Sequence, residues 1–251
     1  MKKFTLSFLS LIFSQTALAE LGFELTYENA IVWESRSVAR IPNASGTLLD
    51  LNVGRKQPLS YTAPRIYLSY SPAEKHELRV LWAPLSIAGI IQRSTDSVFM
   101  GETFAANQNL ETFYKFNSYR LSYIYHFSKD ESWNFALGLT AKIRDAEIRI
   151  SQGSQIASKK NVGFVPLLHF QIHRVLNDEW DALFDLDASA APQGRAFDAA
   201  LKIERLITYF GAGHRLNLFA GYRTVEGGAD VDEVYNFAWF HSMILGVHGI
   251  F

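Results

Sequence analysis

Residues 235–251 read YNFAWFHSMILGVHGIF, and this C-terminal stretch decides the fold class. Large apolar or aromatic side chains stand at every second position, from Tyr235 through Trp239 to Val247, and smaller or polar ones such as Ser242 and His248 stand between them. Because successive side chains of a β-strand point to opposite faces, this alternation predicts a strand with one apolar and one polar face.

The same alternation recurs toward the N-terminus. In residues 180–188, for example, Trp180, Phe184 and Leu186 alternate with Asp185 and Asp187. Counting such runs predicts ten strands, near 21–33, 61–71, 76–88, 112–127, 132–146, 162–175, 180–188, 195–209, 213–225 and 235–251. Most of these runs reach the roughly 9–11 residues that a tilted membrane strand needs.

The connections between the runs alternate in length. Short links at 71–75, 128–131, 176–179 and 210–213 alternate with longer, more polar ones at 34–60, 89–111, 147–161, 189–194 and 226–234. Outer-membrane barrels have short periplasmic turns and longer outer loops, and no soluble sandwich needs this sorting. We therefore predict an all-β, transmembrane, up-and-down antiparallel β-barrel of ten strands. Twelve are the alternative, because 47–53 and 98–104 also alternate.

The N-terminus predicts export. Lys2 and Lys3 precede a short apolar run over 4–13, and Ala17-Leu18-Ala19 supplies small residues before Glu20. We expect a signal peptide at 1–19, cleaved after Ala19, and one barrel domain at 20–251. That domain would carry 22 basic against 25 acidic residues and no cysteine. Nucleic acid is excluded as a partner by this charge, and disulfides by the lack of thiols.

The last residues carry a resemblance to a known class. LGVHGIF at 245–251 resembles the C-terminal assembly signal of bacterial outer-membrane β-barrel proteins, with a final aromatic at Phe251 and a glycine at Gly246. Gly249 and Ile244 depart from the usual pattern. The resemblance implies a Gram-negative outer membrane, insertion by the barrel-assembly machinery, and contact with lipid and lipopolysaccharide. It implies no function and fixes no oligomeric state.

The face opposite the apolar one predicts a charged lumen with both signs in balance. A selective pore usually shows one dominant sign, and ten strands enclose little more than their own side chains. We expect a polar, side-chain-filled lumen and a structural or interaction role that presents outer loops; a narrow, porin-like channel for small solutes is the alternative. The predicted network comprises Glu24, Glu28, Arg65, Glu77, Arg79, Arg120, Lys142, Arg144, His169, His173, Asp185, Asp187, Lys202, Glu204 and Arg223, with His126, Asp198 and Arg215 on the same face.

A lipid-modifying enzyme is the second alternative. His126 and Ser128 resemble the His-x-Ser pair of outer-membrane lipid A deacylases, but they fall beside a periplasmic turn, away from lipid A. His241 and Ser242 are adjacent in a strand, so their side chains point to opposite faces and form no dyad. We therefore expect no catalytic residues, no enzyme and no cofactor.

Two further features concern the outer side. Ten-stranded outer-membrane proteases use aspartates and histidines at the outer rim, where this chain offers Asp145, Asp187, Asp230 and Asp232 but no histidine. The acidic loop holding Asp230, Asp232 and Glu233 is a weak Ca²⁺ candidate, because carboxylate oxygens suit that ion. Its spacing matches no EF-hand, and no other metal site is expected.

Overall fold

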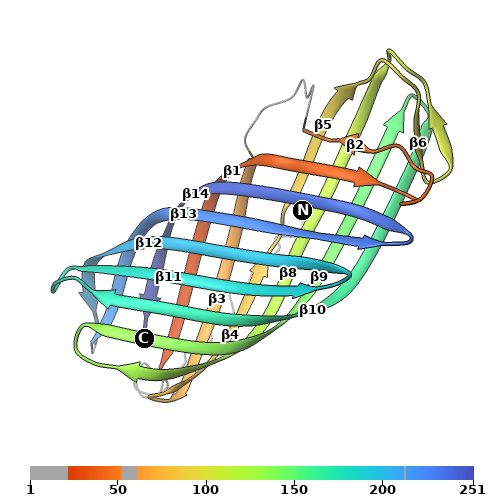
Figure 1. The fold of residues 1–251 in the computed structure, drawn as a ribbon. Helices are drawn as coiled ribbons and strands as arrows, with labels where there is room; N and C mark the ends of the chain where they lie inside the picture. The colour runs from red at the N-terminus through yellow and green to blue at the C-terminus, as the bar shows by residue number, and fades with distance from the viewer. Residues whose placement is uncertain (1–21, 53–60, 212) are drawn as a thin grey trace, which may run out of the picture.

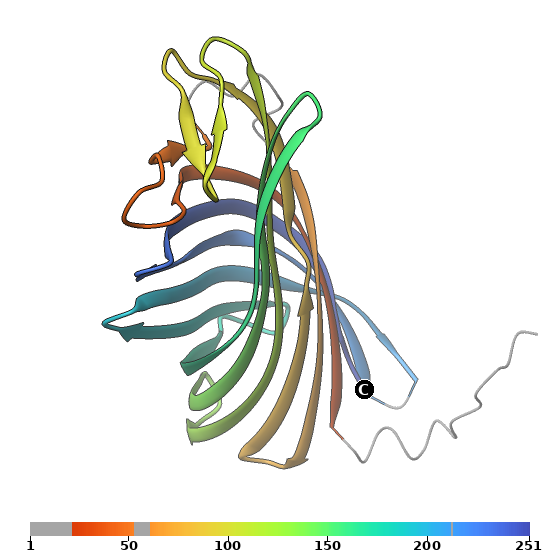
Figure 2. The same ribbon diagram turned by 90° about the vertical axis from the view of Figure 1, so that its right-hand side faces the viewer.

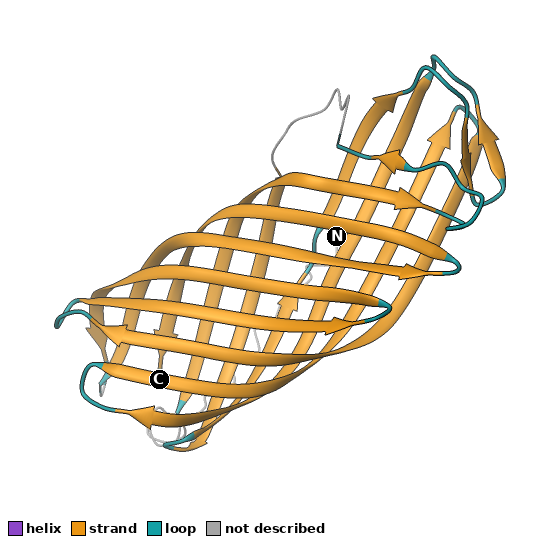
Figure 3. Cartoon of the chain, viewed as in Figure 1, coloured by secondary structure: helices purple, strands orange, loops and turns teal. Residues whose placement is uncertain are grey.

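A computed structural model describes residues 22–52, 61–211 and 213–251, and these consist of strands, turns and loops (Figure 3). The predicted signal peptide at 1–19 and its cleavage site lie outside the described residues. Among the described residues there is no helix with the length and apolar character that a membrane crossing requires.

Ten antiparallel strand positions, which we call staves, close into a barrel, as predicted (Figure 1). They are β1 (Phe23–Arg40), β3 (Tyr61–Ala73), β4 (His76–Ala83) with β5 (Ser86–Gln92), β8 (Asn109–Lys129), β9 (Trp133–Gln152), β10 (Gln155–Val175), β11 (Trp180–Ala191), β12 (Gly194–Phe210), β13 (His214–Val231) and β14 (Val234–Ile250). β4 and β5 both pair with β8 and share one stave, and Pro84, which has no N–H for a ladder, lies between them.

The barrel closes between its first and last strands. β14 pairs with β1 from Glu24 opposite Ile250 to Arg40 opposite Tyr235. Gly246 lies in this seam, where a Cβ atom would overlap the carbonyl oxygen of Tyr27 and the ring of Phe219. A glycine is therefore required there by close packing, in addition to its place in the assembly signal.

Side chains are sorted by charge across the sheet. Leu201 and Ile203 are 56% and 41% exposed, whereas Lys202 and Glu204, which alternate with them, are 4% and 6% exposed. This inverts the arrangement of a water-soluble barrel. A closed sheet pairs its backbone groups internally, so an apolar outer face can contact lipid without unpaired N–H or C=O groups.

The wall is higher on one side than on the other. β8, β9 and β10 have 21, 20 and 21 residues, whereas β11 has 12 (Figure 2). The prediction of long polar loops at 147–161 and 226–234 is therefore wrong. Both segments are mostly paired strand, with tight turns near Gly153 and Asp232. Ladder hydrogen bonds need no apolar side chains, so the strands continue into polar sequence beyond the apolar belt.

The alternative of twelve staves is also wrong. Segment 47–53 contributes only β2 (Leu49–Asp50), and 98–104 forms a separate hairpin of β6 (Ser97–Phe99) and β7 (Glu102–Phe104). Both lie at the long-loop end of the barrel (Figure 1). Together with Ile41, which follows β1, their buried side chains form a cap, which we define by Ile41, Leu49, Leu51, Phe99 and Phe104.

Candidate functional site

The middle of the lumen is crossed by a layer of ion pairs centred on Asp198 of β12. Its carboxylate accepts hydrogen bonds from Arg65 Nη2 at 2.9 Å, Arg120 Nη2 at 2.6 Å and Arg223 Nη1 at 2.6 Å. These arginines come from β3, β8 and β13, so one carboxylate joins strands from around the barrel. Three donors on one buried anion form charge-assisted bonds that fix all four side chains.

Two further carboxylates complete this central ion-pair layer. Glu28, which is fully buried, accepts Arg223 Nε at 2.9 Å and Nη2 at 3.0 Å in a bidentate pair. Asp187 accepts Arg120 Nη1 at 2.6 Å and is also bonded to His169 Nδ1 at 2.9 Å. Arg65 Nε also lies 3.7 Å from Glu28 Oε1, so each of the three arginines contacts two carboxylates and the layer is a connected network.

A second group lies on the short-turn side of this layer. Arg79 Nε donates to Glu77 Oε1 at 2.8 Å, and its Nη1 reaches Asp185 Oδ1 at 3.2 Å. His126 Nε2 lies 3.2 Å from Glu77 Oε2. Lys202 Nζ lies 3.6 Å from Asp185 Oδ2.

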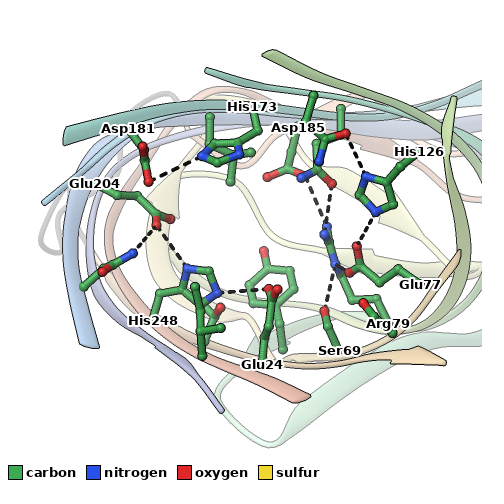
Figure 4. A pocket seen from close by; sticks show the side chains of 18 of the residues that line it. Glu24, Ser69, Glu77, Arg79, His126, His173, Asp181, Asp185, Glu204 and His248 are labelled. Atoms are coloured by element: carbon green, nitrogen blue, oxygen red, sulfur yellow. Dashed lines mark hydrogen bonds and ion pairs between the residues drawn. The ribbon is translucent and has the colours of Figure 1, made fainter. Parts of the chain in front are cut away.

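A cavity of about 270 Å³ opens beyond this group toward the short turns (Figure 4). We call it the vestibule. His248 lies between Glu204 and Glu24, at 3.0 and 3.1 Å, and His173 faces Asp181 at 3.5 Å. The vestibule is thus lined by groups of both signs that already bind one another.

The central ion-pair layer leaves almost no free volume. The void among Arg65, Arg79, Arg120, Asp185 and Asp198 measures about 20 Å³. Holding one water molecule requires at least about 10–15 Å³. The described side chains of the layer therefore leave room for about one water molecule at this point.

Beyond the layer, toward the long loops, the lumen holds an apolar cluster that is bordered by polar groups. Tyr114, Phe116, Ile148, Ile150 and Phe240 are buried there beneath the cap. The expectation of a polar lumen is therefore wrong for this cluster. The inward positions at this level carry aromatic and branched side chains that pack against the cap. Tyr114 also donates to Asn236 Oδ1 at 3.0 Å, and Arg144 and Glu147 line a cavity of about 210 Å³ beside these side chains.

The predicted lumen residues lie at different levels along the barrel axis. Two of them stand apart from the carboxylates: Arg144 Nη2 donates to Asn161 at 2.9 Å, and Lys142 Nζ lies 4.9 Å above the ring of Phe116. The central layer and the vestibule bring together Glu24, Glu28, Arg65, Glu77, Arg79, Arg120, His126, His169, His173, Asp185, Asp187, Asp198, Lys202, Glu204, Arg215 and Arg223.

Sequence reasoning missed three polar members of this lumen. His248 and Asp181 stand on the charged face of their strands, so the alternation of side chains along a strand would have been enough to find them. Tyr67 accepts from Arg65 Nε at 2.8 Å and from Arg223 Nη2 at 2.9 Å. It stands two residues after Arg65 on the same strand, so strand alternation would have placed it inside as well, but its ring resembles a lipid-facing aromatic in sequence.

The predicted outer-rim residues have other partners. Asp187 belongs to the central ion-pair layer, so its predicted place at the rim is wrong. Asp230 accepts from Asn43 Nδ2 at 2.8 Å, and Lys159 lies 2.6 Å from Glu233, where it holds the pKa of that carboxyl below its ordinary value. Within the described ranges no three acidic or histidine side chains come close enough to share a metal ion.

The predicted His–Ser pairs are separated. His126 faces the lumen and binds Glu77 and Asn134, whereas Ser128 is exposed at the turn beyond a bulge in β8. Ser242 is buried on the lumen side, and His241 points to the outer surface and contacts Trp33 and Trp239 there. The two adjacent residues thus lie on opposite faces, as expected.

Comparisons with known proteins support the fold and no more. No family model matches the chain, and no curated protein matches it. Among solved structures it is similar to the outer membrane protease OmpT from Escherichia coli, at 10% identity and a TM-score of 0.52, over 92% of this chain and 97% of that one. Ail of Yersinia pestis (9% identity, TM-score 0.41, 92% and 99% covered) and the toluene transporter TodX of Pseudomonas putida (7%, 0.33, 90% and 89%) also match. The chain has the fold of bacterial outer-membrane β-barrel proteins.

Proposed function

We propose that this chain is an outer-membrane barrel that does not conduct solutes and that acts through its outer surface and long-loop end. The supporting observation is the central ion-pair layer, in which Asp198 binds three arginines and leaves a void of only about 20 Å³. The cap adds an apolar seal at the long-loop end. Its surroundings are outer-membrane lipid and lipopolysaccharide, and the barrel-assembly machinery inserts it.

The lumen offers no catalytic chemistry in this proposal. Its histidines are bonded to carboxylates, as His126 is to Glu77 and His169 to Asp187. No lumen serine or threonine of the described residues is hydrogen-bonded to a histidine, which activation of a hydroxyl nucleophile requires. The lumen charges therefore serve to hold the strands together and to close the path.

Single-channel recording tests the proposal. The refolded protein is incorporated into planar bilayers, and insertion is verified by flotation of matched proteoliposomes. We expect no steady conductance steps. A triple variant, Arg65→Ser, Arg120→Ser and Arg223→Ser, combined with shortening of the β6–β7 hairpin, serves as the opened control and should conduct. Regular steps from the wild-type protein would favour the narrow channel.

A further inference from the structure

A hydrogen-bonded Ser–His–Tyr chain lies on the outer surface of the barrel, outside the lumen. Ser35 Oγ lies 2.8 Å from His241 Nε2, and Tyr222 Oη lies 2.5 Å from His241 Nδ1. The three residues come from β1, β14 and β13, which are neighbours in the sheet. A nucleophile within reach of a base, with the base oriented by a third group, is the arrangement by which hydroxyl nucleophiles are activated.

A β-bulge places Ser35 in this chain. The β1–β14 register passes from Glu34 opposite Phe240 directly to Arg36 opposite Trp239, and Ser35 is the extra residue. It is exposed, and its side chain reaches His241 on the outer face. Bulges re-aim a side chain and occur frequently beside active sites.

The Ser–His–Tyr chain lies at the edge of the apolar belt. Along β1, Leu25, Tyr27 and Ile31 are exposed on the outer face before Ser35 is reached. The rings of Trp33 and Trp239 lie 5.9 and 5.4 Å from the ring of His241. Aromatic residues concentrate at membrane interfaces, the level at which the acyl esters of lipids join the head groups.

Two cations lie farther along the same strand. Arg36 Nη2 donates to Tyr235 Oη at 3.0 Å, and Arg40 donates to Asn43 Oδ1 at 2.8 Å. No carboxylate of the described residues lies within 4.0 Å of either guanidinium in an ion pair. Arginine pairs with phosphate through its planar fork, so these two side chains favour an anionic head group next to the Ser–His–Tyr chain.

We propose that Ser35, His241 and Tyr222 hydrolyse an acyl ester of a phosphate-bearing lipid in the outer leaflet. Ser35 Oγ attacks the ester carbonyl carbon while its proton moves to His241 Nε2. The bond to the lipid alcohol breaks, and the departing oxygen takes that proton. Water then attacks the acyl-Ser35 ester, gives its proton to Nε2, and releases a fatty acid as Ser35 regains its proton.

Tyr222 is a positioning residue in this scheme. In the tautomer that this scheme requires, its oxygen accepts the Nδ1–H of His241, which leaves Nε2 unprotonated and directed at Ser35. The site lies outside the barrel, so the proposal is independent of whether the lumen conducts.

A fluorophosphonate probe tests the nucleophile directly. The wild-type protein, refolded in phosphatidylglycerol vesicles, should be labelled on Ser35, as located by peptide mass spectrometry. Ser35→Ala should abolish labelling, and His241→Gln should slow it about a hundredfold or more, the usual contribution of a general base. Ser37→Ala, which alters a buried serine on the lumen side of β1, should label at the wild-type rate.

Release of fatty acid tests the substrate. Phosphatidylglycerol vesicles, phosphatidylcholine vesicles and lipopolysaccharide are compared, so that the two anionic sources are distinguished from each other and from a zwitterionic lipid. We expect an anionic substrate to be hydrolysed fastest, and Arg36→Gln with Arg40→Gln should remove that preference while Ser35 labelling persists. Tyr222→Phe should lower kcat and leave KM unchanged.

The proposal is overturned if Ser35 is not labelled in the wild-type protein although its circular dichroism shows intact strands. It is also overturned if Ser35 is labelled at the wild-type rate in the His241→Gln variant. Hydrolysis that survives Ser35→Ala would likewise overturn it.

Discussion

Two halves of one lumen are lined by the same strands and filled with opposite kinds of side chain. On the inner face of β1, Thr26 and Glu28 line the vestibule and the central ion-pair layer. Four residues farther on, Val32 stands among apolar side chains. In the first half each group needs a specific partner, and in the second most groups need only close packing. The half with specific partners should therefore respond more strongly to loss of a single group.

Loss of Asp198 should have the largest effect. Asp198→Ala leaves three buried guanidinium groups without their shared carboxylate, and breaking a buried ion pair from one side costs about 3–5 kcal/mol. Urea unfolding of the protein in lipid vesicles measures this loss. Asp178→Ala, in a short turn, is the matched control and should change stability by less than about 0.5 kcal/mol. Equal effects would mean that the layer contributes no stability.

A charge on the lipid face should come next. Leu139, on β9, is 64% exposed and lies in the apolar belt. Leu139→Lys should cost about 2–4 kcal/mol in vesicles, as cationic residues do near the bilayer centre. Ile156→Lys, equally exposed but near the tip of the β9–β10 hairpin, should cost at most about 1 kcal/mol. Similar costs at the two depths would contradict the position given to the belt.

A small deletion in the apolar half should have the smallest effect. Ile150 is fully buried beneath the cap, and Ile150→Val should cost about 0.5–1.5 kcal/mol. The loss should not vary with salt, because no charge is involved. A salt-dependent loss would show that this half is coupled to the ion-pair layer.

The fold was predictable because its signal is local. Alternation along 235–251 and along the other runs gave ten staves and the charged inner face, since side-chain direction in a strand has a period of two. Strand ends were less predictable, as 147–161 shows, because ladder pairing continues where the sequence turns polar. The cap was missed for a different reason: β6 and β7 pair with each other in a separate sheet outside the wall.

The candidate sites were predictable only where the alternation of side chains along a strand decides which face a residue occupies. Alternation placed Asp198 inside and separated His241 from Ser242. It does not find Ser35 as the partner of His241, because a bulge shifts the register and the two residues are 206 positions apart in the chain. The apolar outer half of the lumen was missed because inward aromatics such as Phe240 resemble lipid-facing ones in sequence.

Thiol accessibility on either side of the central layer tests the main claim most directly. The chain has no cysteine, so single substitutions give a clean background. Thr26→Cys and Val32→Cys lie on the same face of β1, on opposite sides of Glu28. A membrane-impermeant thiol reagent applied from the short-turn side should modify the cysteine at 26 and leave the one at 32 unmodified. Modification of both at comparable rates would show an open path through the barrel and contradict the account.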